Sequence, residues 1–150
     1  MANNPQDPAL FYGGEFYVFS NFSSFAVEWK GVLWMTSEYA YQAAHFTDEK
    51  IIESIKNARS AHDSKKLVEA LQDKKRPDWK EVKLSIMEEI VRAKLSQHPY
   101  IQKKLLQTGD REIIEDSPKD SFWGWGPHKD GNNHLGKIWM KLRSEMRAKQ

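Results

Sequence analysis

The chain has 150 residues, a length that suits one domain with a hydrophobic core and is short for two. Its net charge of +2 permits an anionic ligand such as a phosphate, but it lies far below the charge density of a dedicated nucleic-acid-binding arm. The absence of cysteine excludes a disulfide scaffold, a thiolate metal site and a thiol nucleophile.

The N-terminal segment 1–10 is polar and contains proline, so we expect it to be flexible and expect a single domain over 11–150. This segment has neither the basic nor the apolar region of a signal peptide, and no apolar run in the chain approaches membrane-spanning length. We therefore expect a cytoplasmic protein without a membrane partner.

Two short strands are predicted first. Phe25, Val27 and Trp29 alternate with smaller or polar residues, which is the period of a half-buried strand. The break at Lys30-Gly31 indicates a hairpin that returns through 32–34.

Helices are predicted over most of the remaining chain, and Thr36 or Ser37 can cap the first of them. The expected fold class is α+β: a compact single domain, mostly helical, with a small antiparallel sheet built mainly from the N-terminal third. The segments expected after the hairpin are helices in 38–46, 47–58, 60–73, 77–98 and 99–109, a short strand at 112–115 and a last helix from Leu135.

Glu38 is the first candidate functional residue. A capping box begun by Ser37 would place its glutamate where the sequence has Ala40, so Glu38 instead lies in the first turn of the predicted helix. It is either an ordinary helix-end charge or a carboxylate suited to act as a general base or to face a developing cation. Gln42 follows one turn later on the same face and can orient the same substrate, or it is an exposed glutamine.

The stretch "FSNF" is the second candidate, predicted to lie at the end of a strand. Ser20 and Asn21 either form a turn while the phenylalanines pack, or offer hydrogen-bonding groups at the mouth of an aromatic pocket. The sequence favours neither of these two interpretations over the other.

The third candidate is the loop "SFWGWGPHKDGNNHLG" with Asp120 just before it. Gly124 and its neighbouring glycines permit turns or a close approach to a ligand or a helix. An exposed indole such as Trp123 can stack on a heteroaromatic base, although one of the two indoles of the loop is expected to cover the core.

Other chemistries find no support in the sequence. His128 and His134 match no recognised metal-ligand spacing, so no metal site is expected. No serine lies in a nucleophile elbow, and the glycines fit neither a Walker nor a dinucleotide-binding pattern. No cofactor is expected.

Taken in order, the blocks "FSNF", "TSEYAYQAAHF", "DWKEVK", "RAKL", "LLQTGD", "IIE", "DSFWGWG", "GNNHLG" and "MKLR" resemble the NADAR superfamily, whose best-known members are the YbiA-like N-glycosidases. The resemblance runs from Phe19 to Arg143. It implies a compact α+β fold that cleaves N-glycosidic bonds of ribosylated heterocycles without a metal. In the riboflavin branch the substrates are ribosylamino-pyrimidine 5′-phosphates. Other branches are thought to process NAD- or ADP-ribose-derived compounds, including ADP-ribosylated guanine.

The resemblance places the family's essential glutamate on Glu38 and its Asp-x-x-Trp-Gly block on Asp120, Trp123 and Gly124. This chain departs from the family where relatives often have "EHYFQAxKF": the family's histidine is Tyr39 here and its lysine is His45. Imidazole cannot form a Schiff base as an amine would.

The resemblance implies catalytic and binding roles for individual residues, which we state as a hypothesis. Glu38 stabilises an oxocarbenium-like sugar or activates water, and Asp120 orients the water or holds a ribose hydroxyl. The expected substrate-binding residues are Ser20, Asn21, Gln42, His45, Trp123, Gly124 and Asn133, with Lys94 and Arg143 as phosphate contacts or plain helix-surface cations.

The expected partner is a small nucleotide-like substrate, and an ADP-ribosylated nucleic acid is the second candidate. The rival function is a non-catalytic ADP-ribose-binding module that uses the same pocket. A third interpretation, an interaction domain without a small ligand, is opposed by the Trp-Gly loop and by the position of Glu38. The oligomeric state is left open.

Overall fold

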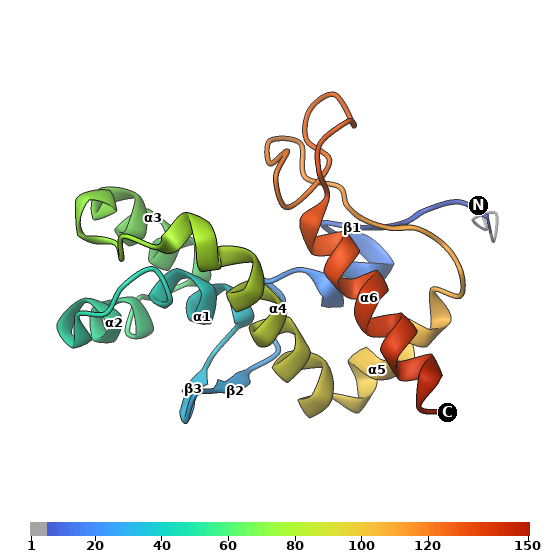
Figure 1. Cartoon of the computed structure of the whole chain (residues 1–150), viewed down its shortest axis with the longest axis horizontal. Coiled ribbons are helices and arrows are strands. Elements are labelled where there is room, and N and C mark those ends of the chain that lie inside the picture. The colour runs from blue at the N-terminus through green and yellow to red at the C-terminus, as the bar shows by residue number, and fades with distance from the viewer. Residues whose placement is uncertain (1–5) are drawn as a thin grey trace. The chain divides into compact units, whose positions relative to one another are not determined.

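The structure is a computed structural model that describes residues 6–150 (Figure 1). The chain divides into two compact units, one formed by residues 21–97 and the other by residues 1–20 together with 98–150. Within the described residues, no helix has the length and apolar character needed to cross a membrane.

A β-hairpin opens the unit of residues 21–97. Strand β2 (Val27–Trp29) pairs antiparallel with β3 (Val32–Trp34). The two turn residues Lys30 and Gly31 have φ values of 52° and 77°, which is the left-handed conformation that a two-residue hairpin turn requires. The predicted hairpin is confirmed.

Helices make up the rest of this unit, and their starts agree with the capping residues of the sequence. The Thr36 hydroxyl accepts from the Tyr39 N–H, the Asp48 carboxylate from the Lys50 N–H, and Ser60 from the Asp63 N–H. The helices are α1 (Ser37–Ala43), α2 (Glu49–Lys56), α3 (Ala61–Ala70), the 3-10 turn η2 (Gln72–Lys74) and α4 (Trp79–Gln97).

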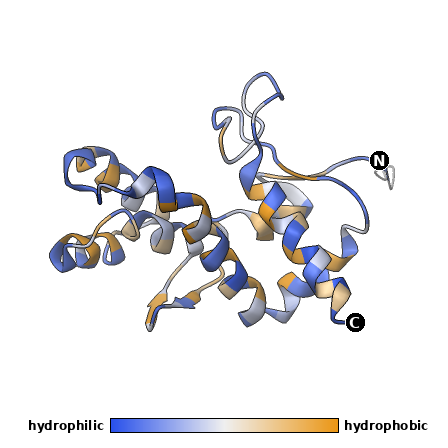
Figure 2. Cartoon of the chain, viewed as in Figure 1, coloured by the Kyte–Doolittle hydropathy of each residue, from blue (hydrophilic) through white to orange (hydrophobic). Residues whose placement is uncertain are grey.

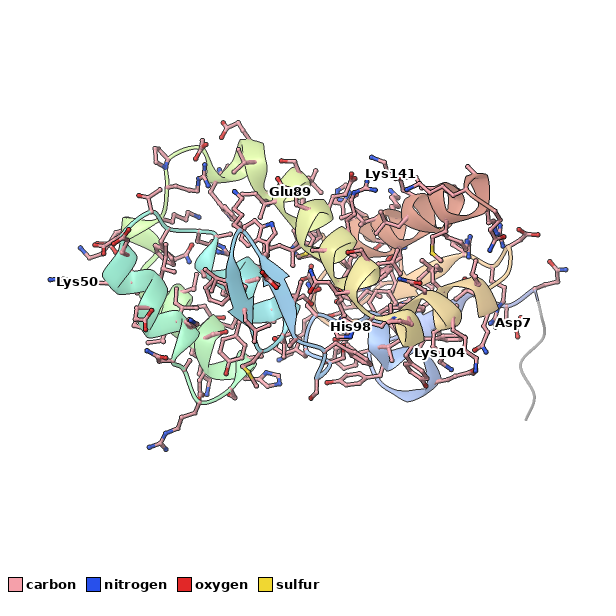
Figure 3. All side chains as sticks on the ribbon, turned by 90° about the horizontal axis from the view of Figure 1, so that it is seen from below. Asp7, Lys50, Glu89, His98, Lys104 and Lys141 are labelled. Atoms are coloured by element: carbon pink, nitrogen blue, oxygen red, sulfur yellow. The ribbon has the colours of Figure 1, made fainter. Side chains whose placement is uncertain are left out.

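Helix α1 is the centre of this unit. It contacts α2, α3 and α4 as well as the hairpin, and every one of its residues is buried, including Glu38 and Gln42. Its neighbours are amphipathic: hydrophobic and hydrophilic residues alternate along α4 (Figure 2), and Lys50 of α2 extends away from the ribbon (Figure 3). Polar residues of α1 are therefore held in a packed environment that a surface helix would not provide.

The second unit contains a short parallel strand pair. Strand β1 (Ala9–Phe11) lies parallel to β4 (Ile113–Glu115), with Ala9 and Phe11 fully buried. The α+β class is confirmed, but this pair is parallel and not part of an antiparallel sheet. Of the segment predicted to be flexible, 1–5 lies outside the described residues, whereas Ala9 and Leu10 belong to β1. That part of the prediction is wrong, because residues 113–115 supply the hydrogen-bonding partner that local sequence could not reveal.

The stretch "FSNF" begins at the last residue of a 3-10 helix, η1 (Gly14–Phe19), and not at the end of a strand as predicted. Phe19 is fully buried, with ring centroids 6.0 Å from Phe11, 5.9 Å from Phe16 and 4.9 Å from Trp139. The Trp139 indole N–H also donates to the Phe19 carbonyl over 3.1 Å. Phe19 is therefore a core residue, as the structural interpretation of this stretch predicts.

Two further helices complete this unit, α5 (Pro99–Gln107) and α6 (His134–Ala148). Pro99 occupies the first turn of α5, where its missing N–H costs no hydrogen bond. Helix α6 packs on β4, and Leu135, Ile138, Trp139 and Leu142 form its buried face.

Candidate active site

Glu38 lies in the first turn of α1 and is 6% exposed. Its backbone N–H donates to the Asn21 carbonyl over 3.0 Å, and the Gln42 amide donates to its Oε2 over 3.4 Å. Glu38 and Gln42 are thus in contact, as their spacing of one helical turn implies. A buried carboxylate with an amide donor on one oxygen is held in a defined orientation.

Asn21 is attached to the same helix. The Ser37 hydroxyl lies 3.0 Å from the Asn21 Oδ1 and 3.3 Å from its backbone oxygen, and the Asn21 Nδ2 donates to the Met87 sulfur over 3.4 Å. These contacts fix which way the amide points. Ser20 precedes it at the end of the other unit, with its N–H bonded to the Tyr17 carbonyl over 2.9 Å.

Lys94 is 0% exposed, so it is not a plain helix-surface cation. Its Nζ donates to the Ser23 hydroxyl over 2.9 Å and lies 5.8 Å from the centre of the Phe25 ring. Burial lowers the pKa of Lys94 to about 7, because the ammonium form loses its hydration. The ammonium group therefore ties α4 to the segment that carries Asn21.

His45 follows α1 and is stacked on Trp79 with ring centroids 3.8 Å apart. Its Nδ1 lies 3.2 Å from the Tyr41 carbonyl and 3.0 Å from the Gln42 carbonyl, so Nδ1 carries the proton and donates. Burial lowers the pKa of His45 to about 4, against the opposing effect of these two carbonyls. The imidazole is thus neutral at pH 7.

We expect the stability of the protein to fall as the pH is lowered from about 6.5 to about 4, because the unfolded chain binds a proton on His45 that the folded chain does not. The full effect is roughly 3 kcal/mol, and most of it is lost by pH 5. Urea denaturation at pH 7 and pH 5 measures the change, and H45F, which keeps an aromatic ring on Trp79 but cannot titrate, provides the comparison. An equal loss of stability in H45F would show that His45 is not its source.

In the second unit, Asp120 holds the start of the Trp-Gly loop. Its Oδ1 accepts from the Phe122 N–H over 2.9 Å and from the Trp123 N–H over 2.8 Å. The Trp123 ring is half-buried and lies edge-on to Phe122 and His134, at 4.8 Å and 6.4 Å. Asp120 therefore has at least a structural role, which is to set the backbone from which Trp123 projects.

The glycines of this loop are required mainly for close backbone packing. A Cβ on Gly124 would lie 2.6 Å from the Glu115 carbonyl oxygen, and one on Gly131 would lie 2.6 Å from that of Ser121. Asn133 uses both ends of its amide on β4, since its Nδ2 donates to the Ile113 carbonyl over 2.9 Å and its Oδ1 accepts from the Glu115 N–H over 2.9 Å. These contacts give both Gly124 and Asn133 a role in the packing of this unit.

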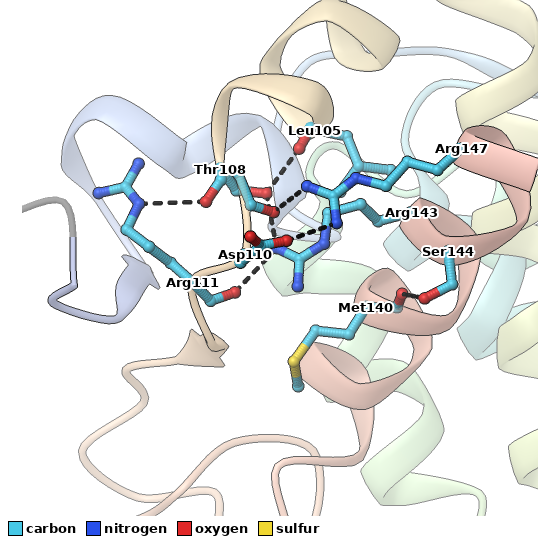
Figure 4. A network of polar contacts seen from close by, with 9 residues as sticks. Leu105, Thr108, Asp110, Arg111, Met140, Arg143, Ser144 and Arg147 are labelled. Carbon is cyan, nitrogen blue, oxygen red and sulfur yellow. Dashed lines mark hydrogen bonds and ion pairs between the residues drawn. The ribbon is translucent and has the colours of Figure 1, made fainter. Parts of the chain in front are cut away.

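Arg143 has protein partners on its guanidinium. Its Nη1 donates to the Thr108 hydroxyl and to the Arg111 carbonyl, each over 2.8 Å, and the side chain is buried (Figure 4). Beside it, Arg147 donates to Asp110 over 2.8 Å. This network fastens α6 to the end of α5 and accounts for Arg143 without a ligand.

The structure thus brings together one group of predicted residues in each unit. Around α1 it collects Asn21, Glu38 and Gln42, and around the loop it collects Asp120, Trp123, Gly124 and Asn133. Among residues 6–150, no group of three or more His, Asp or Glu side chains is arranged to hold a metal ion.

Sequence reasoning missed two contributors to the first group. The sequence pattern indicates that Trp79 belongs to the apolar face of its helix and that Ser37 is a capping residue. Their actual contacts, with His45 and Asn21, link residues 34 and 16 positions apart, so no local pattern signals them.

The model of the NADAR domain family matches residues 10–147. The chain is a member of the NADAR family. Among curated relatives, an N-glycosidase of Nostoc punctiforme is 42% identical over 132 residues, covering 86% of this chain and 85% of the relative. The N-glycosidase YbiA of Escherichia coli is 34% identical over 128 residues, covering 85% of this chain and 80% of YbiA.

The fold of this NADAR chain agrees with a solved structure. The NMR structure of Escherichia coli YbiA superimposes with a TM-score of 0.86 at 32% identity, covering 96% of this chain and 87% of that one. A riboflavin biosynthesis protein of Vibrio vulnificus is 37% identical over 127 residues, which cover 85% of this chain but 35% of that longer protein. The predicted family is confirmed.

Proposed function

We propose that this NADAR protein is an N-glycosidase that hydrolyses the N-glycosidic bond of a ribosylated heterocycle. The substrates would be ribosylamino-pyrimidine 5′-phosphates of the riboflavin pathway, and the products the free pyrimidine and ribose 5-phosphate. The observation that carries the proposal is the buried Glu38 carboxylate, oriented by Gln42, in a family whose relatives are named N-glycosidases. Because such phosphorylated substrates do not cross membranes unaided, the proposal includes a cytoplasmic location.

The main group that this hydrolysis requires from the protein is a carboxylate held in a fixed position. As the bond between the sugar C1′ and the amino nitrogen on the pyrimidine breaks, its electron pair leaves with that nitrogen and positive charge develops on the sugar. Glu38 would stabilise that charge or accept a proton from the attacking water. The water oxygen forms the new bond to C1′, and its proton ends on the released base.

The remaining residues are proposed as binding groups. Asn21 and Gln42 would bind sugar or base edges beside Glu38, while Trp123 would stack on the heterocycle, a contact worth roughly 1–3 kcal/mol. Asp120 would orient water or a ribose hydroxyl with the carboxylate oxygen that does not hold the loop.

Replacing Asp120 by asparagine separates these two functions of its carboxylate. Asparagine keeps a side-chain oxygen for the Phe122 and Trp123 N–H groups but removes the charge, so we expect D120N to fold normally and to lose about 10–100-fold in kcat/KM. D120A removes both, and should in addition lower the free energy of unfolding by about 1 kcal/mol. Steady-state kinetics and urea denaturation measure the two effects. Full activity in D120N would leave Asp120 a purely structural role.

A panel of ribosides tests the proposed activity. Purified protein is incubated in parallel with riboflavin-pathway intermediates, NAD, ADP-ribose and ADP-ribosylated guanine, and free base is detected by mass spectrometry. We expect free pyrimidine from the ribosylamino-pyrimidine phosphates. Absence of free base from every member of the panel would overturn the proposal.

A second candidate is an ADP-ribosyl hydrolase or a non-catalytic ADP-ribose-binding module, with ADP-ribosylated nucleic acid as a partner. It is favoured by His45, a neutral imidazole at the position where the resemblance to the family implies a lysine. Free guanine base from the panel would support the hydrolase. Calorimetric binding of ADP-ribose without any product would support the binding module.

A further inference from the structure

The indole of Trp34 is a buried hydrogen-bond donor without an acceptor. Trp34 is the last residue of β3 and is 4% exposed, yet within residues 6–150 its Nε1–H makes no hydrogen bond. An indole nitrogen can donate but cannot accept, and a buried donor without a partner carries the full desolvation penalty of the group. Because native interiors pair nearly all such groups, this one requires an explanation.

The hairpin directs Trp34 into the interior of its unit. The chain neighbours Leu33 and Met35 are 60% and 66% exposed, so the Trp34 side chain lies on the opposite, buried face of the strand. On that face it is paired with Val27, which is fully buried. The hairpin contacts α1 and α4, so Trp34 faces the two helices that carry Glu38 and the Asn21 partner Met87.

Side chains of α4 hold the hairpin in this orientation. The Gln97 Oε1 accepts from the Glu28 N–H and the Gln97 Nε2 donates to the Glu28 carbonyl, each over 2.8 Å. The indole of Trp29 donates to the Glu89 Oε1 over 3.4 Å. The other indole of the hairpin thus has an acceptor on α4, so the unpaired N–H is a particular property of Trp34.

Trp34 also lies close to Glu38 along the chain. Four residues separate the two, with the α1 cap Thr36 between them, and four residues of extended chain span at most about 14 Å between Cα atoms. Both side chains are buried in the same unit, one at the end of β3 and the other in the first turn of α1. The Trp34 donor therefore belongs to the surroundings of the Glu38 carboxylate.

Gln42 supplies a second, independent observation. Its Nε2 donates to the Glu38 Oε2 over 3.4 Å, whereas its Oε1 accepts no hydrogen bond in the part of the chain that the structure describes. Gln42 is 6% exposed. The surroundings of Glu38 thus contain an unused donor on Trp34 and an unused acceptor on Gln42. A ligand with hydroxyl groups can satisfy both, because a hydroxyl both donates and accepts.

We propose that Trp34 is a substrate-binding residue whose indole N–H donates to an uncharged oxygen of the ligand beside Glu38, while the Gln42 Oε1 accepts from a hydroxyl of the same ligand. The proposal rests on the proposed function for its ligand, a ribosylated heterocycle. The oxygen belongs to a ribose hydroxyl or to a carbonyl of the heterocycle. A phosphate is disfavoured, because no lysine or arginine lies over the Trp34 ring within residues 6–150 to offset its lost hydration.

The test compares two buried indoles. W34F keeps an aromatic ring and removes the unpaired N–H, whereas W139F removes an N–H that donates to the Phe19 carbonyl over 3.1 Å. Urea denaturation of both variants is measured without ligand. Ribose 5-phosphate and uracil, a pyrimidine with two carbonyls and no sugar, are then titrated into each protein by calorimetry. In the wild type the Trp34 indole N–H, assigned as the signal missing from W34F, is followed by NMR.

We expect W34F to keep a higher urea midpoint than W139F, because only W139F breaks a hydrogen bond. At least one probe should move the Trp34 signal of the wild type to lower field: ribose 5-phosphate if the acceptor is a hydroxyl, uracil if it is a carbonyl. W34F should weaken binding of that probe about tenfold and W139F by less than about threefold.

A Trp34 signal that neither probe moves, undiminished binding by W34F, or an equal loss of urea midpoint in both variants would overturn the proposal. The riboside panel measures turnover, which this test does not need. A shifted Trp34 signal beside an inactive panel would therefore overturn the proposed hydrolysis and leave the binding role of Trp34 intact.

Discussion

Replacing Glu38 by glutamine should lower kcat by about 10²–10⁴-fold on the riboside that the wild type cleaves, while the protein remains folded. Glutamine has the same shape and can still face the Gln42 amide, so the packing of α1 is kept. It cannot carry the negative charge that stabilises a cationic sugar or take a proton from water. Single-turnover kinetics with mass-spectrometric detection of the free base measures the loss, and denaturation measures the stability.

The matched control is E49Q. Glu49 is the acidic residue in the first turn of α2, as Glu38 is in the first turn of α1, but its side chain is exposed. We expect E49Q to retain full activity, because the loss of one helix-end charge is worth only a few tenths of a kcal/mol. Activity of E38Q within about threefold of wild type would remove Glu38 from the catalytic role.

Replacing Gly136 by alanine should destabilise the protein by about 3 kcal/mol or more. A Cβ at this position would lie 2.1 Å from the Ile113 carbonyl oxygen and 2.4 Å from the Asn133 Nδ2. The backbone of β4 cannot yield without losing its pairing with β1, and α6 would have to move away from the strand. Since Asn133 also bonds β4, the loop that carries Trp123 should loosen as well.

Gly13 provides the control for this substitution. A Cβ there would meet nothing within 4 Å, and its φ of −139° is open to any residue, so we expect G13A to change the free energy of unfolding by less than about 0.5 kcal/mol. Urea denaturation of both variants measures the difference. A loss below about 1 kcal/mol in G136A would show that α6 and β4 separate easily.

The family and most of the elements could be predicted without the structure. Capping residues such as Thr36 and Ser60, the Lys30-Gly31 turn and Pro99 act through neighbours one to four positions away, so their local pattern determines where α1, α3, the hairpin and α5 begin. The ordered motif blocks predicted the NADAR family, and the relatives named N-glycosidases agree with the predicted class of enzyme.

Long-range pairing could not be predicted in the same way. Segment 1–10 looks flexible because its residues are polar, yet Ala9 is buried in a strand completed by Ile113, more than a hundred positions away. The "FSNF" stretch shows the same limit: Phe19 packs on Trp139, and its local sequence carries no record of that partner.

For the candidate site, the sequence by itself determined the chemistry of the groups: a carboxylate at Glu38, an amide one turn later at Gln42, and an acid followed by indoles and glycines from Asp120. Only the tertiary structure decided the state of each group. It buries Glu38 against Gln42, buries Lys94 on Ser23, gives Arg143 and Asn133 protein partners, and makes His45 neutral between Trp79 and two carbonyls. The physical reason is that charge, orientation and accessibility depend on desolvation and on partners distant in the chain, and neither is encoded in local spacing.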